Sequence, residues 1–126
     1  MKPFRGNIEK LTEENENFRK VLFTGKHSQL VVMSLNADEE IGMEVHPKVD
    51  QFIRIESGKV KFILNGEESK GGDGDAVVIP AGTNHNVINT GDGKLKLYTI
   101  YSPANHPEGT IHATKKQADE YEASHH

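Results

Sequence analysis

Apolar and polar residues alternate in short runs along most of the chain, and each run is bounded by Gly, Asn or Asp. The apolar or β-branched runs cover residues 21–23, 29–35, 51–56, 60–64, 76–79, 86–88 and 95–101. Many short strands at regular spacing are typical of a sandwich or barrel. We therefore predict an all-β fold.

The run that begins at Val60 shows how such a strand divides its two faces. Val60, Phe62 and Leu64 point to one side and the intervening lysine points to the other, because side chains alternate along a strand. An Asn-Gly pair at 65–66 follows and predicts a type I′ hairpin to the next strand. Antiparallel pairing of neighbouring strands is expected.

Two runs lack a polar face. Residues 30–33 are apolar on both sides, and Phe52 lies opposite the face that carries Ile53 and Ile55. Part of the outer surface is therefore expected to be covered, either by the N-terminal residues or by a second subunit. We predict a homodimer.

The two ends of the chain differ from its middle. Residues 1–19 are polar with a brief helical pattern over 8–14, and residues 103–126 begin as an irregular loop and end in a predicted short helix over 115–123. We predict one domain, divided into an N-terminal arm (1–19), a barrel (20–102) and a C-terminal loop and helix (103–126).

Composition narrows the chemistry. The chain of 126 residues has no cysteine, so any metal must be held by nitrogen and oxygen atoms. Its net charge is -4 and its lysines are scattered, which argues against nucleic acid as a partner. The chain shows neither an apolar run long enough to span a membrane nor the apolar stretch of a secretory signal, so we expect no membrane partner and a cytoplasmic location. His125 and His126 are either a tag remnant or native and carry no part of the functional prediction.

A polar cluster carries the candidate chemistry. Glu44 and His46 are two residues apart, which in a strand places both side chains on one face. Gln51 shares a face with the predicted core residue Ile53, and burial of such polar groups is costly unless they are paired or bind a cation. His85 follows a Pro-x-Gly corner that aims it at a defined place. The hypothesis is a metal site of Glu44, His46, Gln51 and His85.

Two alternatives remain open for this cluster. His85 is either a ligand or a structural histidine that forms a hydrogen bond. Asp50 takes the place of Gln51 if the turn differs by one residue.

The second half of this cluster resembles a known family motif. Gly74, Pro80, Gly82, His85 and Asn89 match every fixed place of the second cupin motif. The resemblance covers residues 30–101 and implies a double-stranded β-helix, the jelly-roll barrel of cupins.

The first cupin motif is matched in spacing but not in residue type. His46 and Gly58 agree with it, whereas Glu44 replaces the first histidine and Gln51 replaces the glutamate. The usual set of three neutral imidazoles and one carboxylate carries one negative charge, and the present set carries the same. The resemblance still implies a divalent transition metal, which would be Fe(II), Mn(II), Ni(II) or Zn(II).

The resemblance implies that any reaction of this protein depends on the bound metal. We hypothesise isomerase or lyase chemistry on a sugar, sugar acid or keto acid, with Glu44 as a ligand or, once displaced, as the base. The alternatives are a non-catalytic barrel that binds a small molecule through its metal, and an Fe(II) dioxygenase. A phosphate-bearing substrate is disfavoured, because the sequence shows no basic cluster near the predicted pocket.

Other polar and aromatic residues receive simpler interpretations. His106 and His112 are expected to be loop residues, or else one of them carries protons beside the metal. Tyr98 and Tyr101 are interpreted as strand or interface aromatics. The residues left open as pocket-lining are Met33, Met43, Phe62, Tyr98 and Ile100. A solvated face is expected for Arg54, Glu56, Lys59, Lys61, Lys94 and Lys96.

Overall fold

The computed structural model describes residues 1–124, so His125 and His126 lie outside the described residues. Along the chain the elements are α1 (Ile8–Glu14), β1 (Arg19–Thr24), β2 (Gln29–Leu35), β3 (Asp50–Ser57), β4 (Val60–Leu64), β5 (Glu67–Gly71), β6 (Ala76–Ile79), β7 (His85–Asn89), β8 (Leu95–Ser102), β9 (Ile111–His112) and α2 (Lys115–Ser124).

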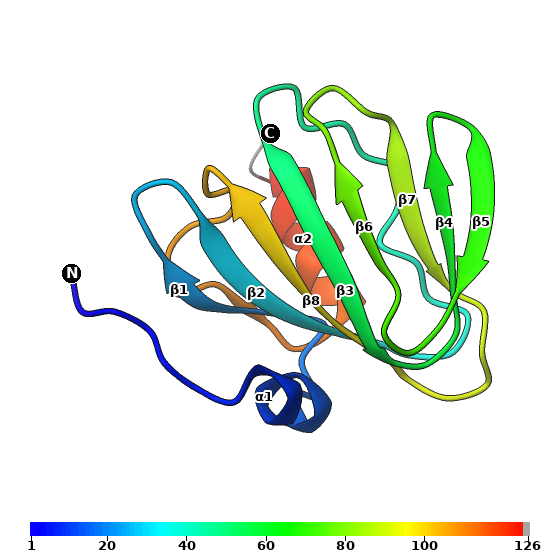
Figure 1. Ribbon diagram of the computed structural model, residues 1–126, viewed down its shortest axis with the longest axis horizontal. Coiled ribbons are helices and arrows are strands. Elements are labelled where there is room, and N and C mark those ends of the chain that lie inside the picture. Colours follow the sequence, from blue (N-terminus) through cyan, green and yellow to red (C-terminus); the bar gives the residue numbers. More distant parts are fainter. Residues whose placement is uncertain (125–126) are drawn as a thin grey trace.

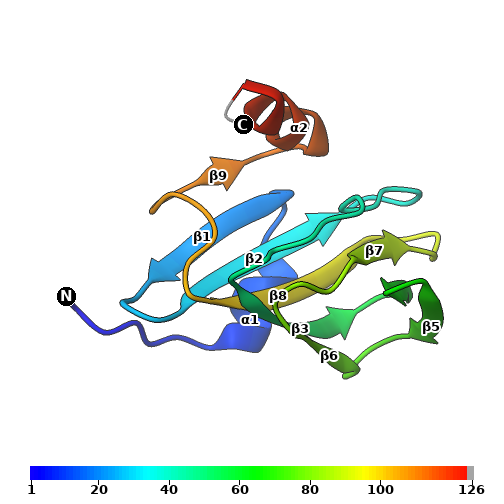
Figure 2. The same cartoon turned by 90° about the horizontal axis from the view of Figure 1, so that it is seen from above.

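The strands form two antiparallel sheets. The larger sheet has the order β6-β3-β8-β2-β1-β9, and the smaller has the order β5-β4-β7 (Figure 1). Figure 2 shows α2 beyond β9, at the edge of the larger sheet. The prediction of an all-β jelly roll with a short C-terminal helix is confirmed.

The core lies between the inner faces of the two sheets. In the larger sheet Met33 pairs with Leu97, and Leu97 pairs with Ile55, so all three side chains share one face. Val60 and Phe62 oppose them from β4, as their alternation predicted. Each fully buried side chain of this kind stabilises the fold by about 1.5–3 kcal/mol.

The N-terminal residues cover the outer face of the larger sheet. Val32 points outward from β2 yet is buried, and it lies in a hollow that is also lined by Leu11 and Glu14 of α1. Thr12, which is fully buried, donates a hydrogen bond to the Ile8 carbonyl and keeps its hydroxyl satisfied. The arm therefore supplies the cover that the apolar outer face requires.

This cover also buries a lysine. Lys96 is only 6% exposed, and its Nζ donates to the Asn15 carbonyl and, at 3.3 Å, to Glu16 Oε1. The expectation that Lys96 belongs to a solvated face is wrong, because the N-terminal segment folds over it. Its ammonium group keeps its hydrogen bonds, so burial is tolerated.

The ends of the chain join the sheet. Arg19 of β1 pairs with His112 of β9, and Lys20 pairs with Ile111. Strands thus lie on both sides of the predicted barrel limits of 20–102, and the division into arm, barrel and tail stays a prediction. The hairpin prediction is confirmed, since Asn65 (φ 51°) and Gly66 (φ 83°) both have the positive φ that a type I′ turn needs.

Within residues 1–124, no helix has the length and apolarity needed to cross a membrane.

Candidate metal centre

A segment without regular structure runs beside β7 and brings the first cluster to the second. Glu44 and His85 exchange two backbone hydrogen bonds, of 2.8 and 2.9 Å, and Gly82 N donates to the His46 carbonyl at 2.9 Å. Residues that form such an antiparallel pair direct their side chains to the same side. Gly82 has φ 85°, which lets the chain turn into β7 after Pro80. The local backbone therefore aims Glu44 and His85 at one place.

Three side chains converge there. Glu44, His46 and His85 each offer one ligand atom, and these atoms lie within 4.8 Å of one another. Glu44 Oε2 is 3.8 Å from His46 Nε2, and the two imidazole rings have centroids 5.3 Å apart. A metal ion with bonds of about 2.0–2.2 Å spans at most about 4.4 Å between two ligand atoms, so the 3.8 Å between Glu44 Oε2 and His46 Nε2 is within the reach of one ion.

The tautomer of His85 leaves one nitrogen available. His85 Nδ1 lies 3.0 Å from the Thr83 carbonyl, which can only accept, so Nδ1 carries the proton. His85 Nε2 is then a lone-pair donor to a metal. Among residues 1–124, neither this atom nor His46 Nε2, both buried, has a hydrogen-bond partner.

Gln51 faces the same interior. It is only 3% exposed, its Nε2 donates to Thr99 Oγ1 at 3.0 Å, and its Oε1 has no partner in the described part of the chain. Gln51 pairs with Tyr101 across the sheet, and the Tyr101 ring meets His46 edge-on with centroids 6.0 Å apart.

Asp50, the alternative to Gln51, has a different role. It is exposed, and its Oδ1 accepts a hydrogen bond from the Ala81 amide at 2.9 Å. Asp50 therefore fixes the Pro80-Gly82 corner from outside, while the neighbouring Gln51 points inward.

The donor atoms fit a divalent transition metal. An unpaired buried acceptor costs about 1–3 kcal/mol, and here His46 Nε2, His85 Nε2 and Gln51 Oε1 are all unpaired. Together with the Glu44 carboxylate they form a nitrogen and oxygen set suited to Fe, Mn, Ni or Zn.

Burial governs the ionisation of the cluster. Burial raises the pKa of the Glu44 carboxyl, against the opposing effect of the Arg19 guanidinium. Burial and the neighbouring His85 lower the pKa of His46. The imidazole of His46 is therefore held in the neutral form that a metal requires.

Tyr101 and His106 line the site on another side. His106 Nε2 lies 3.3 Å from the Tyr101 hydroxyl, and burial, followed by the charge of Arg19, lowers the pKa of His106 to about 3. The buried Gln29 fixes this loop, because its Nε2 donates to the His106 carbonyl at 2.7 Å and its Oε1 accepts from the amides of Asn105 (3.1 Å) and His106 (3.0 Å).

The register of β8 decides which aromatic residue faces inward. Tyr101 is buried beside His46, whereas Tyr98 points outward and pairs with Arg54. Tyr101 is therefore not only an aromatic residue of a strand, because its ring contacts His46 of the candidate metal centre. Of the other pocket candidates, Met33 and Phe62 point into the core, Ile100 shares the outer face of Tyr98, and Met43 is exposed.

Arg19 was missed by the sequence analysis. It is 4% exposed and pairs across the sheet with the core residue Met33, so its side chain enters the interior. The residue had been assigned to the polar arm. Arg19 lies two residues before Val21, the start of the first apolar run, and residues two apart in a strand share a face. This spacing is the signal that could have identified it.

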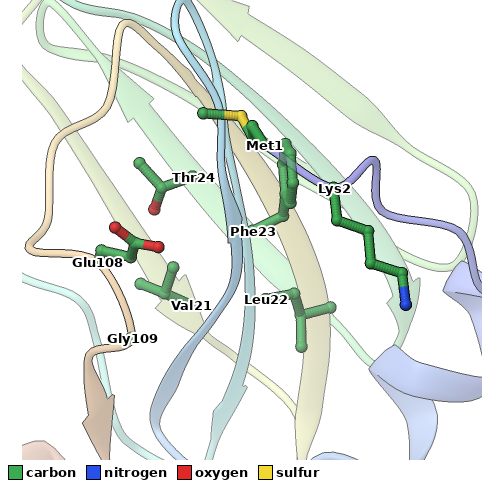
Figure 3. Close-up of a pocket in the computed structure, with 8 residues that line it drawn as sticks. All are labelled: Met1, Lys2, Val21, Leu22, Phe23, Thr24, Glu108 and Gly109. Carbon is green, nitrogen blue, oxygen red and sulfur yellow. The ribbon is translucent and has the colours of Figure 1, made fainter.

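A separate surface hollow lies away from this cluster. Figure 3 shows it beside β1, where the side chains of Lys2 and Glu108 lie on opposite sides of the strand. Its volume is about 410 Å³. It contains none of the converging ligand atoms, so the chemistry is assigned to the cluster around His85.

Known proteins resemble the chain over most of its length. YrkC of Bacillus subtilis (strain 168), described as an uncharacterized protein, is 53% identical over 124 residues, which cover 93% of this chain and 66% of YrkC. The uncharacterized protein L612 of Acanthamoeba polyphaga mimivirus is 44% identical over 117 residues, covering 89% of this chain and 72% of L612. The chain thus spans about two thirds of the length of YrkC.

A solved structure and a family description agree with the fold. The crystal structure of BH2720 from Bacillus halodurans superimposes with a TM-score of 0.93 at 45% identity, covering 94% of this chain and 95% of that one. The Cupin domain family matches residues 31–101, the stretch that holds Glu44, His46, Gln51 and His85. The chain belongs to the cupin family.

Proposed function

We propose that Glu44, His46, Gln51 and His85 bind a divalent transition metal, and that the protein uses it for isomerase or lyase chemistry on a small sugar, sugar acid or keto acid. One observation carries the proposal. Two buried imidazole nitrogens, His46 Nε2 and His85 Nε2, have no hydrogen-bond partner within residues 1–124, and these two histidines form with Glu44 a group whose ligand atoms lie within 4.8 Å of one another.

The chemistry divides between the metal and the chain. A bound divalent metal would polarise a carbonyl or hydroxyl oxygen and acidify the adjacent C–H or O–H. Glu44 serves as a ligand or, once displaced, accepts the proton at its carboxylate oxygen. Thr83 holds the orientation of His85 through Nδ1, and the apolar interior around Met33 and Phe62 excludes water.

Metal content tests the ligand assignment. We expect wild-type protein purified without chelators to contain a transition metal by mass spectrometry, and the double variant His46→Ala/His85→Ala to lose it. His27 is exposed and lies outside the cluster, so His27→Ala is the matched control and should retain the metal. Unchanged metal occupancy in the double variant would remove the assignment.

Oxygen uptake separates the proposed chemistry from its alternatives. With candidate sugar acids and keto acids, we expect substrate turnover without oxygen consumption. Oxygen consumption by iron-loaded protein would instead favour a dioxygenase, and a wild type that contains no metal would favour plain small-molecule binding.

The homodimer and the cytoplasmic location stay predictions from the sequence. Apolar surface that a second subunit could cover is present at Met43, Val45, Val78 and Ile111, all of which are exposed. Light scattering at micromolar concentration tests the dimer, and a monomeric mass would contradict it.

A further inference from the structure

A pocket adjoins the candidate metal centre. It has a volume of about 260 Å³ and lies between α2 and the segment that carries Glu44. Arg19 and Glu44 form part of its wall, and Glu122 of α2 is exposed at its rim. The candidate ligand Glu44 therefore belongs both to the metal cluster and to this pocket.

Arg19 brings a buried positive charge into the pocket. Its guanidinium cannot lose its proton in a protein, and burial of an unpaired charge is strongly unfavourable. Its Nη1 lies 3.5 Å from His112 Nδ1, which is a neutral partner because burial and Arg19 itself lower the pKa of His112. Within residues 1–124 its Nε has no hydrogen-bond partner and its guanidinium forms no ion pair with a carboxylate, although its Cζ lies 5.4 Å from the centroid of the Phe18 ring.

The positive potential of Arg19 extends across the site. Burial has the largest influence on the pKa values of Glu44, Tyr101 and His106, and the Arg19 guanidinium acts on each of them as the next cause, towards a lower value. An anion placed in the pocket would meet this potential directly.

The net charge of the metal site also favours an anion. His46, His85 and Gln51 are neutral ligands and Glu44 is one carboxylate, so a divalent cation bound to them leaves a net positive charge. Arg19 adds a second positive charge beside it. A low-dielectric site with this balance favours a negatively charged ligand.

Apart from Glu44, whose charge a bound metal would offset, the acidic residues that line the pocket do not neutralise Arg19 from within. Asp119 is exposed and forms an ion pair with Lys115, with its Oδ2 2.7 Å from Lys115 Nζ. Glu122 is exposed at the rim, and from there its negative charge acts on the site, where it acts to raise the pKa of Glu44 and of His46.

We propose that Arg19 binds the carboxylate of the substrate, and that the substrate is a small monocarboxylate with a carbonyl or hydroxyl oxygen on the neighbouring carbon. The planar guanidinium matches the two oxygens of a carboxylate. A metal held by the proposed ligands would bind the neighbouring oxygen. This inference rests on the proposed function, and it selects the acids from the sugars, sugar acids and keto acids named above.

A pair of probes isolates the carboxylate. Pyruvate and hydroxyacetone have the same skeleton and the same ketone oxygen, but only pyruvate is charged. We expect Mn²⁺-loaded wild type to bind pyruvate at least about ten-fold more tightly than hydroxyacetone by isothermal titration calorimetry. Equal affinity for the two probes would overturn the proposal.

The matched variants place this preference at Arg19. Arg19→Gln should lose most of the pyruvate preference and keep only the part that the net positive metal site contributes, while its affinity for Mn²⁺ alone changes by less than about three-fold. Arg5 is exposed in the N-terminal arm, so Arg5→Gln should keep the pyruvate preference. An undiminished pyruvate preference in folded Arg19→Gln contradicts the proposal.

A surface variant keeps the test decisive if Arg19→Gln does not fold. Glu122→Gln alters an exposed side chain and removes a negative charge near the pocket, so it should tighten pyruvate binding about two- to three-fold and leave hydroxyacetone unchanged. No change in the pyruvate affinity of this variant would count against the proposal.

Metal-free protein separates this inference from the proposed function. Wild type that takes up none of Fe²⁺, Mn²⁺, Ni²⁺ and Zn²⁺ would refute the metal proposal. A pyruvate preference that persists in that protein and disappears in Arg19→Gln would still support the carboxylate site, and its absence there would refute both.

Discussion

The two segments that meet at the candidate metal centre are built differently. In the 74–89 segment, Asn89 is buried and donates through Nδ2 to three backbone carbonyls, and His85 is buried with Nδ1 bonded to Thr83. In the 40–46 segment, Glu44 and His46 are only partly buried, and between them Val45 is 45% exposed. The hydrogen-bonded 74–89 segment, called the rigid segment below, therefore holds the fold, while the looser 40–46 segment carries the charge.

Replacement of Asn89 should have the largest effect on stability. Asn89→Ala leaves the carbonyls of Leu35, Asn36 and Gly93 without their donor, so we expect the free energy of unfolding to fall by about 2–4 kcal/mol. Urea denaturation measures it. Asn84 has an exposed side chain, and Asn84→Ala should change stability by less than about 0.5 kcal/mol. A loss of metal affinity in Asn89→Ala without loss of stability would show instead that Asn89 supports the metal site and not the fold.

Replacement of Glu44 should show the opposite pattern. Glu44→Gln removes the only carboxylate of the proposed ligand set, so metal affinity should fall about 10–100-fold, or about 1.4–2.7 kcal/mol. Stability without metal should not decrease, because burial disfavours the charged form of this side chain. Calorimetric titration with Mn²⁺ and urea denaturation measure the two quantities. The exposed Glu67 provides the control, Glu67→Gln, and equal metal affinity in both variants would exclude Glu44 as a ligand.

The rigid segment was the more predictable of the two. Its fixed glycines, proline, histidine and asparagine depend on local backbone geometry, and the structure gives Gly74 and Gly82 the positive φ that the turns require. The strand limits 29–35, 60–64 and 76–79 also agree with the pattern of apolar residues. Local rules were sufficient here, because each turn is determined by neighbours in sequence.

Prediction from local sequence failed where the burial of a residue depends on long-range contacts. Arg19 and Lys96 are cations, which are rarely buried, and their burial depends on segments distant in sequence: β9 with its His112 for Arg19, and the N-terminal arm for Lys96. Whether Tyr98 or Tyr101 faces the site depended on the register of β8, which a one-residue shift would reverse.

The corner of the rigid segment can be tested by a smaller change. Gly82 has φ 85° and no atom within 4 Å of an added Cβ, so Gly82→Ala costs only backbone strain, about 1–2 kcal/mol. Gly93 also has open space, without a positive φ, and Gly93→Ala should be within about 0.5 kcal/mol of wild type by thermal denaturation. Equal effects of the two substitutions would show that the corner does not depend on its left-handed residue.

The smallest expected effect concerns acid. His106 has a pKa of about 3 in the folded protein because of burial, against about 6.5 when unfolded. The unfolded chain therefore binds more protons between these values, and stability should fall as pH decreases below about 6.5. Between pH 7.5 and 5.5 we expect His106→Gln to lose less stability than wild type, by up to about 1 kcal/mol. Identical pH slopes in urea denaturation would contradict this.

The Gln29 amide has a consequence for how a ligand reaches the site. Its three hydrogen bonds to Asn105 and His106 hold the loop after β8 against the sheet, and Gln29 is itself fully buried. Displacing this loop would break all three hydrogen bonds together, at a free-energy cost of about 1 kcal/mol each. The loop after β8 is therefore a fixed wall of the candidate site, and a ligand of the kind proposed above would enter instead through the pocket between α2 and Glu44.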